Sequence, residues 1–245
     1  KNNVLLLFEA AVAGGIPIIK TLKNNIFLNK VKKISGILNG TTNFILTKMY
    51  EDNLSFNEVL EIAKARGYTT DNESKLDIGG LDSAHKLTLI STLCFGSEIS
   101  FDNNIIEGIE NITIDDINNA NKLGYKIKLL SEVSIIDSKI YCTTSPTLIS
   151  KKHPLSNVDG VLNGIVIETD QLKSLFLEGE GAGGKATASS VISDLHEIFS
   201  KSNHLSLGYS INKLNDFVKL DLIQIESKYY ISILCKDNAG VLSKI

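Results

Sequence analysis

The segment GGLDSAHKLTLISTLCFG, residues 79–96, constrains the fold of this chain more than any other feature. A helix is predicted over residues 78–95, and its apolar residues are spread around nearly its whole circumference. A helix of this kind is normally buried. The chain has 245 residues, of which 43% are hydrophobic. That is enough for one large core or two modest ones, so the helix can be enclosed.

Strand and helix patterns alternate around this segment. Strands are predicted at residues 4–8, 31–38, 126–136, 139–144, 160–168 and 175–179. Helices are predicted at residues 16–25, 41–52, 55–66, 115–123 and 187–200, with residues 204–228 as a connector. The helix predicted at residues 55–66 is well marked, since Ser55 and Glu58 form a capping box and Gly67 closes the helix. The alternation predicts an α+β or an α/β fold.

Two charges on the apolar helix are unexpected. Asp82 and Lys86 are four residues apart and share one helix face. A surface ion pair, worth a few tenths of a kcal/mol, is the ordinary explanation. However, charge is scarce on this helix and gathers at its N-terminal end, where Asp77 precedes the predicted helix start. A desolvated Lys beside carboxylates can transfer a proton near neutral pH, and unpaired carboxylates suit an ammonium group. We therefore predict a small substrate that carries an amino group.

Two glycine-containing junctions are candidate ligand sites. NGTTN, residues 39–43, could hold a carboxylate or phosphate at a helix N-terminus, or Thr41 could simply cap the helix. GEGAGGKATAS, residues 179–189, allows backbone N–H groups to approach an anion or a flat ring, although a plain structural turn remains an alternative. A nucleotide P-loop is rejected because Ala186 stands where the motif needs Ser or Thr.

Charge and hydropathy exclude several classes of protein. The net charge of -3 gives no basic face for nucleic acid. No apolar run approaches the roughly 18 residues that a membrane span requires. The three cysteines are far apart in apolar runs, which predicts buried thiols in a reducing, cytoplasmic compartment. The chain begins and ends within apparent elements, so we expect a fragment of a longer protein.

Five motifs, taken in order, resemble the homoserine dehydrogenase family. They are FEAAVAGGIPII, ILNGTTNFILTKM, GLDSAHKL, LGYKIKLL and GEGAGGKATAS, and they cover about residues 4–200. The tail YYISILCKDNAGVLSKI is similar to the start of an ACT domain. The resemblance implies an α+β fold, with a mixed or antiparallel sheet covered by helices and remnants of flanking Rossmann and ACT (ferredoxin-like) domains.

The same resemblance implies a domain organisation. Residues 1–12 would be the last strand of a truncated nucleotide-binding domain, and residues 13–200 the catalytic and dimerisation domain. Residues 201–227 would be a linker and residues 228–245 the start of the ACT regulatory domain. Without its nucleotide-binding half, the isolated chain is expected to bind dinucleotide poorly.

The activity implied by the resemblance is the NAD- or NADP-dependent interconversion of L-homoserine and L-aspartate 4-semialdehyde, by a homodimer or higher homo-oligomer. Lys86 would be the proton shuttle, with Asp82 beside it on the substrate. Further substrate-binding positions implied by the motifs are Asp77, Thr41 and Tyr68. The cofactor-binding positions would be Gly40, Gly67, Gly179, Gly181 and Gly183. A monovalent cation, Na⁺ or K⁺, would be held by Glu9, Val12, Gly14 and Ile16.

The sequence departs from the family pattern at several positions. The family usually has a Glu for the substrate amino group where this chain has Thr70, so Asp71 or Glu73 would take that role, and we assign it to Asp71. Glu180 and Ala186 replace the usual prolines of the glycine loop. A non-catalytic amino-acid-sensing module linked to an ACT domain is the alternative function, and it predicts that Lys86 is dispensable.

Overall fold

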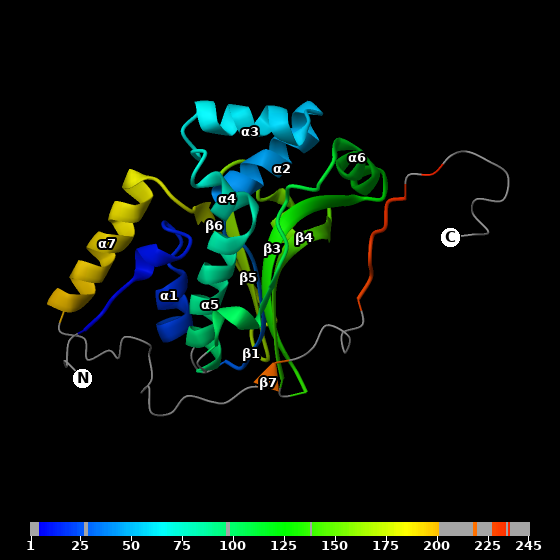
Figure 1. Ribbon diagram of the computed structural model, residues 1–245. Coiled ribbons are helices and arrows are strands. Elements are labelled where there is room, and N and C mark those ends of the chain that lie inside the picture. Colours follow the sequence, from blue (N-terminus) through cyan, green and yellow to red (C-terminus); the bar gives the residue numbers. More distant parts are fainter. Residues whose placement is uncertain are drawn as a thin grey trace.

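The computed structural model describes residues 5–26, 29–96, 99–137, 139–200, 218–219, 227–233 and 235. Its centre is a mixed sheet with the strand order β2-β4-β3-β1-β5-β6, and β7 pairs with β4 (Figure 1). The strands are β1 (Val31–Ile37), β2 (Asn104–Ile106), β3 (Tyr125–Ile136), β4 (Lys139–Ser150), β5 (Leu162–Thr169), β6 (Ser174–Glu180) and β7 (Val218–Lys219). The pairs β2–β4 and β4–β7 are parallel, and the other neighbours are antiparallel. The predicted α+β class with a mixed sheet is confirmed.

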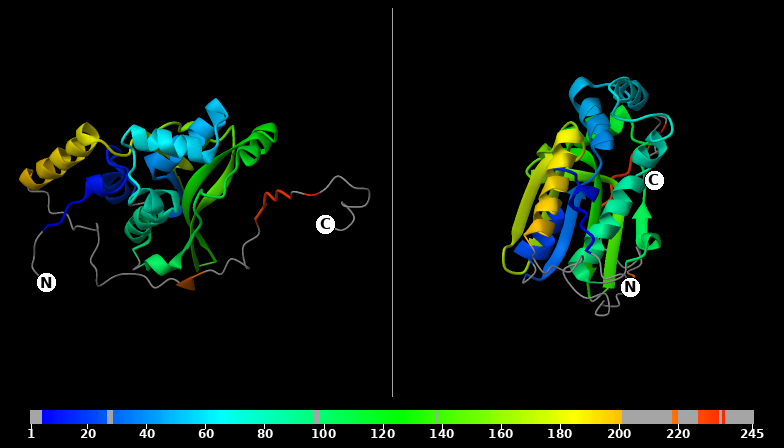
Figure 2. Two further views of the ribbon diagram at one scale, coloured as in Figure 1. Left: turned by 45° about the horizontal axis from the view of Figure 1, so that its top comes forward. Right: turned by 90° about the vertical axis from the view of Figure 1, so that its left-hand side faces the viewer.

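Helices of very different lengths connect and cover these strands. The α-helices are α1 (Ile18–Lys20), α2 (Gly40–Asp52), α3 (Phe56–Ala65), α4 (Ser74–Ile78), α5 (Leu81–Phe95), α6 (Ile114–Lys122) and α7 (Gly184–Phe199). Short turns of other helix types are η1 (Glu9–Ala11), η2 (Thr21–Asn25), η3 (Phe101–Asn103) and η4 (Pro154–Asn157). Both views in Figure 2 show α2 and α3 beyond one end of the strands, while α5 packs on β1, β3 and β4.

The helix α5 packs against a row of apolar side chains on one face of the sheet. Cys142, Val133, Ile34 and Ile167 are register partners on four neighbouring strands, and all belong to the core cluster that includes Leu87 of α5. Because side chains alternate along a strand, Leu130 lies on the opposite face, in a smaller cluster beneath η4. The prediction that the apolar helix is enclosed is therefore confirmed.

Several sequence-based boundaries were wrong. The helix predicted over residues 78–95 is α5, which begins only at Leu81, because Gly80 adopts a left-handed φ of 81° in the turn between α4 and α5. Asp77 therefore lies in the last turn of α4 rather than before a helix start. The structure gives no strand at residues 5–8. The strand predicted at 139–144 continues to Ser150 because β3 pairs with it along its whole length.

Some predictions fall mostly beyond the described residues. The linker at 201–227 and the ACT start at 228–245 are described only at residues 218–219, 227–233 and 235. Among the cysteines, Cys142 is buried and Cys94 is partly buried, but Cys235 is exposed, so the prediction of buried thiols was wrong there. Over the described ranges, the structure contains no helix with the length and apolar character needed to cross a membrane.

Candidate active site

The N-terminus of α2 organises the candidate site. Asn39 caps this helix: its Oδ1 accepts from the backbone N–H of Thr42 at 2.9 Å. Thr41 was predicted as the cap, but its hydroxyl instead donates to the carbonyl of Tyr68 at 3.0 Å. Asn is a strong N-cap because its side-chain oxygen reaches the unpaired N–H groups of the first turn. Capping by Oδ1 leaves the Asn39 amide NH₂ group free to point toward other partners.

The Asn39 amide joins the two carboxylates predicted for the pocket. Asn39 Nδ2 donates to Asp77 Oδ1 at 2.8 Å and to Asp82 Oδ2 at 3.0 Å. Lys86 Nζ lies 2.7 Å from Asp82 Oδ2 and donates to the carbonyl of Leu38 at 3.0 Å. The predicted trio Asp77, Asp82 and Lys86 is therefore one connected group, with two carboxylates to a single ammonium.

The ion pair of this group is neither fully buried nor an ordinary surface pair. The side chains of Lys86 and Asp82 are 22% and 33% exposed, so a ligand can reach both. Burial raises the pKa of the Asp77 carboxyl above its usual value, and the charge of Asp82 acts in the same direction. Hydrogen bonds from Asn39 and from Thr69, whose hydroxyl is 3.1 Å from Asp77 Oδ2, oppose this rise in pKa. A positively charged ligand group would stabilise ionised Asp77.

The turn after α3 brings Tyr68 to the same place. The N–H of Gly67 donates to the carbonyl of Lys64, and the N–H of Tyr68 donates to that of Ala63. These two bonds form a Schellman motif, which requires the left-handed φ of 73° at Gly67. The predicted C-terminal glycine is thus confirmed. The Tyr68 carbonyl then accepts from Thr41, and the Tyr68 ring lies edge-on to Phe44 with ring centres 5.0 Å apart.

Asp71 is not brought to this group in the structure. Its side chain is 86% exposed and pairs with Lys64 of α3 at 2.8 Å. Glu73, the other residue considered for the same role, accepts from the Thr70 hydroxyl at 2.9 Å. Either carboxylate would have to leave its present partner in order to bind a ligand beside Asp77.

The glycine loop lies against the segment that follows η1. A Cβ on Gly14 would stand 2.7 Å from the carbonyl oxygen of Gly181, and the N–H of Gly15 donates to the carbonyl of Glu180 at 2.9 Å. Two chain segments about 165 residues apart are therefore in backbone contact, and Gly14 permits it because it has no side chain. Gly183 has a φ of 109° and open space where a Cβ would be. The loop thus presents bare backbone at the start of α7.

The residues predicted to hold a cation are close together in the chain and largely buried. Glu9 is 2% exposed, and its two carboxylate oxygens accept from the N–H groups of Ile19 at 2.8 Å and Lys20 at 2.9 Å. Burial raises the pKa of Glu9. The carbonyl of Gly14 accepts from the hydroxyl of Ser190 at 2.6 Å. Val12 and Ile16 are also buried, so this segment is tied to both α1 and α7.

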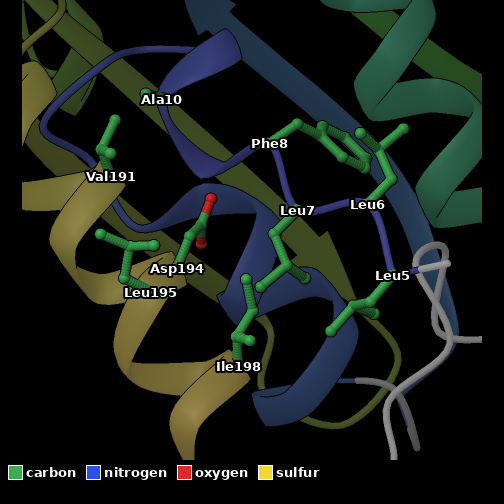
Figure 3. Close-up of a pocket in the computed structure, with 9 residues that line it drawn as sticks. All are labelled: Leu5, Leu6, Leu7, Phe8, Ala10, Val191, Asp194, Leu195 and Ile198. Atoms are coloured by element: carbon green, nitrogen blue, oxygen red, sulfur yellow. The ribbon is translucent and has the colours of Figure 1, made fainter.

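A pocket of about 350 Å³ lies elsewhere, between α7 and residues 5–8 (Figure 3). Its α7 side presents Val191, Leu195 and Ile198 at helical spacing, and each is 46–47% exposed. Leu6, on the opposite wall, is 64% exposed. This apolar surface shares no residue with the Asp77–Asp82–Lys86 group.

Sequence reasoning missed Asn39 and Thr69 as members of the site. Asn39 had a signal, since an Asn directly before a helix is a typical N-cap. Its donation to two carboxylates had none, because Asp77 and Asp82 lie about 40 residues away in the chain. Thr69 follows the Schellman turn and gave no signal of its own.

Comparisons with known proteins identify the family of this chain. The family model for homoserine dehydrogenase matches residues 17–196. The homoserine dehydrogenase of Pseudomonas aeruginosa is 38% identical over all of this chain, and that of Helicobacter pylori is 40% identical over all of it. The chain spans 58% and 57% of the lengths of these two relatives.

Solved structures show the same similarity. A homoserine dehydrogenase from Thiobacillus denitrificans superposes with a TM-score of 0.80 at 38% identity, over 86% of this chain and 50% of that one. A hyperthermophilic archaeal homoserine dehydrogenase mutant in complex with NADPH gives 0.67 at 32% identity, over 80% and 56%. The motifs, the fold and these matches agree, and the chain belongs to the homoserine dehydrogenase family.

Proposed function

We propose that the protein containing this chain interconverts L-homoserine and L-aspartate 4-semialdehyde as an NAD- or NADP-dependent oxidoreductase. Such a reaction is a step toward threonine and methionine. The observation that carries the proposal is the 2.7 Å contact between Lys86 Nζ and Asp82, in a group accessible to a ligand. The lysine can transfer a proton, and the carboxylates can hold an amino acid in place.

Lys86 is the proposed acid–base residue. In the oxidation of homoserine, the amine form of Lys86 accepts the proton of the hydroxyl oxygen as the alcohol carbon loses a hydride. In the reverse direction, Lys86 returns the proton to the aldehyde oxygen. Asp82 and the carbonyl of Leu38 hold Nζ in one place, which keeps the lysine oriented toward the reacting oxygen.

The carboxylates are proposed to bind the substrate ammonium group. Asp77 and Asp82 together carry one negative charge more than Lys86 neutralises, so an ammonium group is the complementary ligand. Thr41 and Tyr68 lie at the edge of the same group and are proposed as further substrate contacts. Asp71 remains a prediction for this role and would first have to break its ion pair with Lys64.

NAD or NADP, when bound, supplies the hydride acceptor of the oxidation. The residues fit such a ligand, since Gly183 at the start of α7 exposes backbone beside open space. We propose that Gly40, Gly67, Gly179, Gly181 and Gly183 contact it. The archaeal homoserine dehydrogenase mutant solved in complex with NADPH supports a dinucleotide as the cofactor. The choice between the two dinucleotides is not set by these glycines.

We also propose a Na⁺ or K⁺ ion at Glu9, Val12, Gly14 and Ile16. The buried Glu9 carboxylate, with its raised pKa, supports the assignment because a nearby cation would favour its charged form. Backbone carbonyls are suitable ligands for a hard cation.

The proposed domain division follows the predicted one, with residues 1–12 as the end of a nucleotide-binding domain, 13–200 as the catalytic domain, 201–227 as a linker and 228–245 as an ACT start. The exposed apolar surface between α7 and residues 5–8 supports it, because such a surface commonly packs against another domain (Figure 3).

A homodimer formed through the sheet is the proposed assembly. The face opposite α5 carries polar, partly buried side chains, among them Ser35 beside Glu132, which accepts from its hydroxyl at 3.3 Å. A sheet face of this kind can accept a second sheet. We assign the protein to the cytoplasm, where the thiols of Cys94, Cys142 and Cys235 would remain reduced.

The test uses the full-length protein as its genome encodes it. Reduction of NAD⁺ and NADP⁺ with L-homoserine is followed by absorbance for the wild type, Lys86→Ala and Lys48→Ala. Lys48 pairs with Asp52, four residues later, and its side chain is 26% exposed. This lysine–aspartate pair on α2 matches the Asp82–Lys86 pair in its spacing along the helix and serves as the control. Losing the acid–base residue should lower kcat by about 10²–10⁴.

Lys48→Ala should retain wild-type activity. Inactive wild-type protein with both cofactors would reject the proposed reaction and favour the amino-acid-sensing module instead. A Lys86→Ala protein that keeps its activity would leave the reaction but reject the role of Lys86.

A further inference from the structure

Lys128 of β3 is a buried lysine that the proposed reaction does not use. It is 2% exposed and is the largest fully buried side chain among the described residues. Removing an ammonium group from water is unfavourable, and a buried ion pair often stabilises a protein no better than apolar side chains of similar size. Stability alone therefore explains this lysine poorly.

The ammonium group joins three separate parts of the chain. Lys128 Nζ lies 2.8 Å from Asp159 Oδ1 and donates to the carbonyl of Val158 at 2.7 Å. It also donates to Oδ1 of Asn43, in the first turn of α2, at 3.0 Å. The lysine thus connects β3, the loop before β5 and the helix whose N-terminus holds the candidate site.

The loop before β5 is also in direct contact with this helix turn. The Asn43 amide donates to the carbonyls of Val158 at 2.9 Å and Leu162 at 3.0 Å. A Cβ on Gly40 would lie 2.7 Å from the carbonyl oxygen of Val161, so the loop and the helix start are in close backbone contact. Lys128 neutralises the charge of Asp159 and donates to the Val158 carbonyl, so it orients the loop that makes this contact.

We propose that Lys128 is a positioning residue that holds the first turn of α2, and through it Asn39, against the two carboxylates of the reaction site. This inference rests on the proposed function. Asn39 is one helical turn before Asn43, and its amide bridges Asp77 and Asp82. A shift of this turn displaces that amide from the carboxylates, and Asp82 in turn holds Lys86.

Lys126 provides a matched control. Its Nζ lies 2.9 Å from Oδ2 of the same Asp159, but its other neighbour is the ring of Tyr50, in the last turn of α2, with Nζ 5.0 Å from the ring centre. Lys126→Met therefore removes a positive charge from Asp159 without removing a contact to the first turn of α2. Lys128→Met removes the charge together with that contact.

The first measurement is amide hydrogen exchange of residues 39–47 in the full-length protein, which needs no catalytic activity. Lys128→Met should accelerate exchange there by at least about tenfold, and Lys126→Met should leave it at the wild-type rate. Unchanged exchange in Lys128→Met would overturn the proposal. An inactive wild-type enzyme would reject the proposed function while this measurement still decided the role of Lys128.

The second measurement is kinetic. Lys128→Met should lower kcat for homoserine oxidation by about 10–100-fold, because small displacements of reacting groups have effects of that size. In an Asn39→Ala background the same change should cost less than about threefold, since the lysine acts through Asn39. Equal losses in both backgrounds would mean a merely structural role and would overturn the proposal.

If Lys128→Met does not fold, Lys128→Gln takes its place in both measurements. That variant removes the ammonium group that reaches Asn43, Val158 and Asp159 and keeps a polar side chain at the same position. The expected results and the overturning results are the same as for Lys128→Met.

Discussion

Replacing Asn39 tests whether one amide holds the two carboxylates of the site. Asn39→Ala removes the N-cap of α2 and both donations to the carboxylates, whereas Asn39→Ser keeps a capping oxygen and removes only the donations. The difference between these two variants therefore isolates the cap, and the difference between Asn39→Ser and wild type isolates the amide bridge.

The magnitudes follow from the burial of each partner. Loss of the cap should cost about 1 kcal/mol. Loss of the donation to the partly buried, charged Asp77 should cost about 2 kcal/mol. The donation to Asp82 adds little, because that side chain is 33% exposed and retains Lys86 as a partner. Asn39→Ala should thus lose about 3 kcal/mol of unfolding free energy, and Asn39→Ser about 2 kcal/mol.

Urea unfolding followed by circular dichroism measures both variants against wild type. The midpoints should fall in the order wild type, Asn39→Ser, Asn39→Ala, with unchanged m values. An Asn39→Ser protein with the wild-type midpoint would refute the reasoning, since the amide bridge would then contribute no stability. Activity measured on the same proteins should fall in Asn39→Ser, because Asp82 loses the donor that aligns it with Lys86.

Two further predictions concern Asp77 and the glycine contact. The raised pKa of Asp77 means that its ionised form destabilises the fold above that pKa, and that this penalty disappears as pH falls through it. Asp77→Asn should therefore melt at a higher temperature than wild type at pH about 8, and the two should converge near pH about 4; a constant difference across this range would contradict the burial argument. Gly14→Ala should lose about 1–3 kcal/mol, because its Cβ would meet the Gly181 carbonyl at 2.7 Å. Gly184→Ala, whose Cβ meets open space, is the matched control for thermal unfolding and should be neutral or slightly stabilising; equal losses in both variants would show that the contact is not the cause.

Local sequence signals predicted the parts of the fold that depend on neighbouring residues. The capping box of Ser55 and Glu58 and the turn at Gly67 both formed as expected. The i,i+4 spacing of Asp82 and Lys86 predicted their ion pair. The predicted start of α5 is three residues too early because the apolar pattern extends back to Ile78, and a glycine inside a helical pattern signals a break only weakly.

The sequence by itself determined the mixture of strands and helices, the buried character of α5 and the charged pair on that helix, since helical and strand periodicity are encoded over a few residues. Only the tertiary structure decided that Asn39 bridges Asp77 and Asp82, and that Lys128 is buried against Asn43. These contacts join residues 38 to 85 positions apart. Periodicity specifies which face of an element is apolar, but the partner across that face is selected by the packing of the whole sheet and its helices.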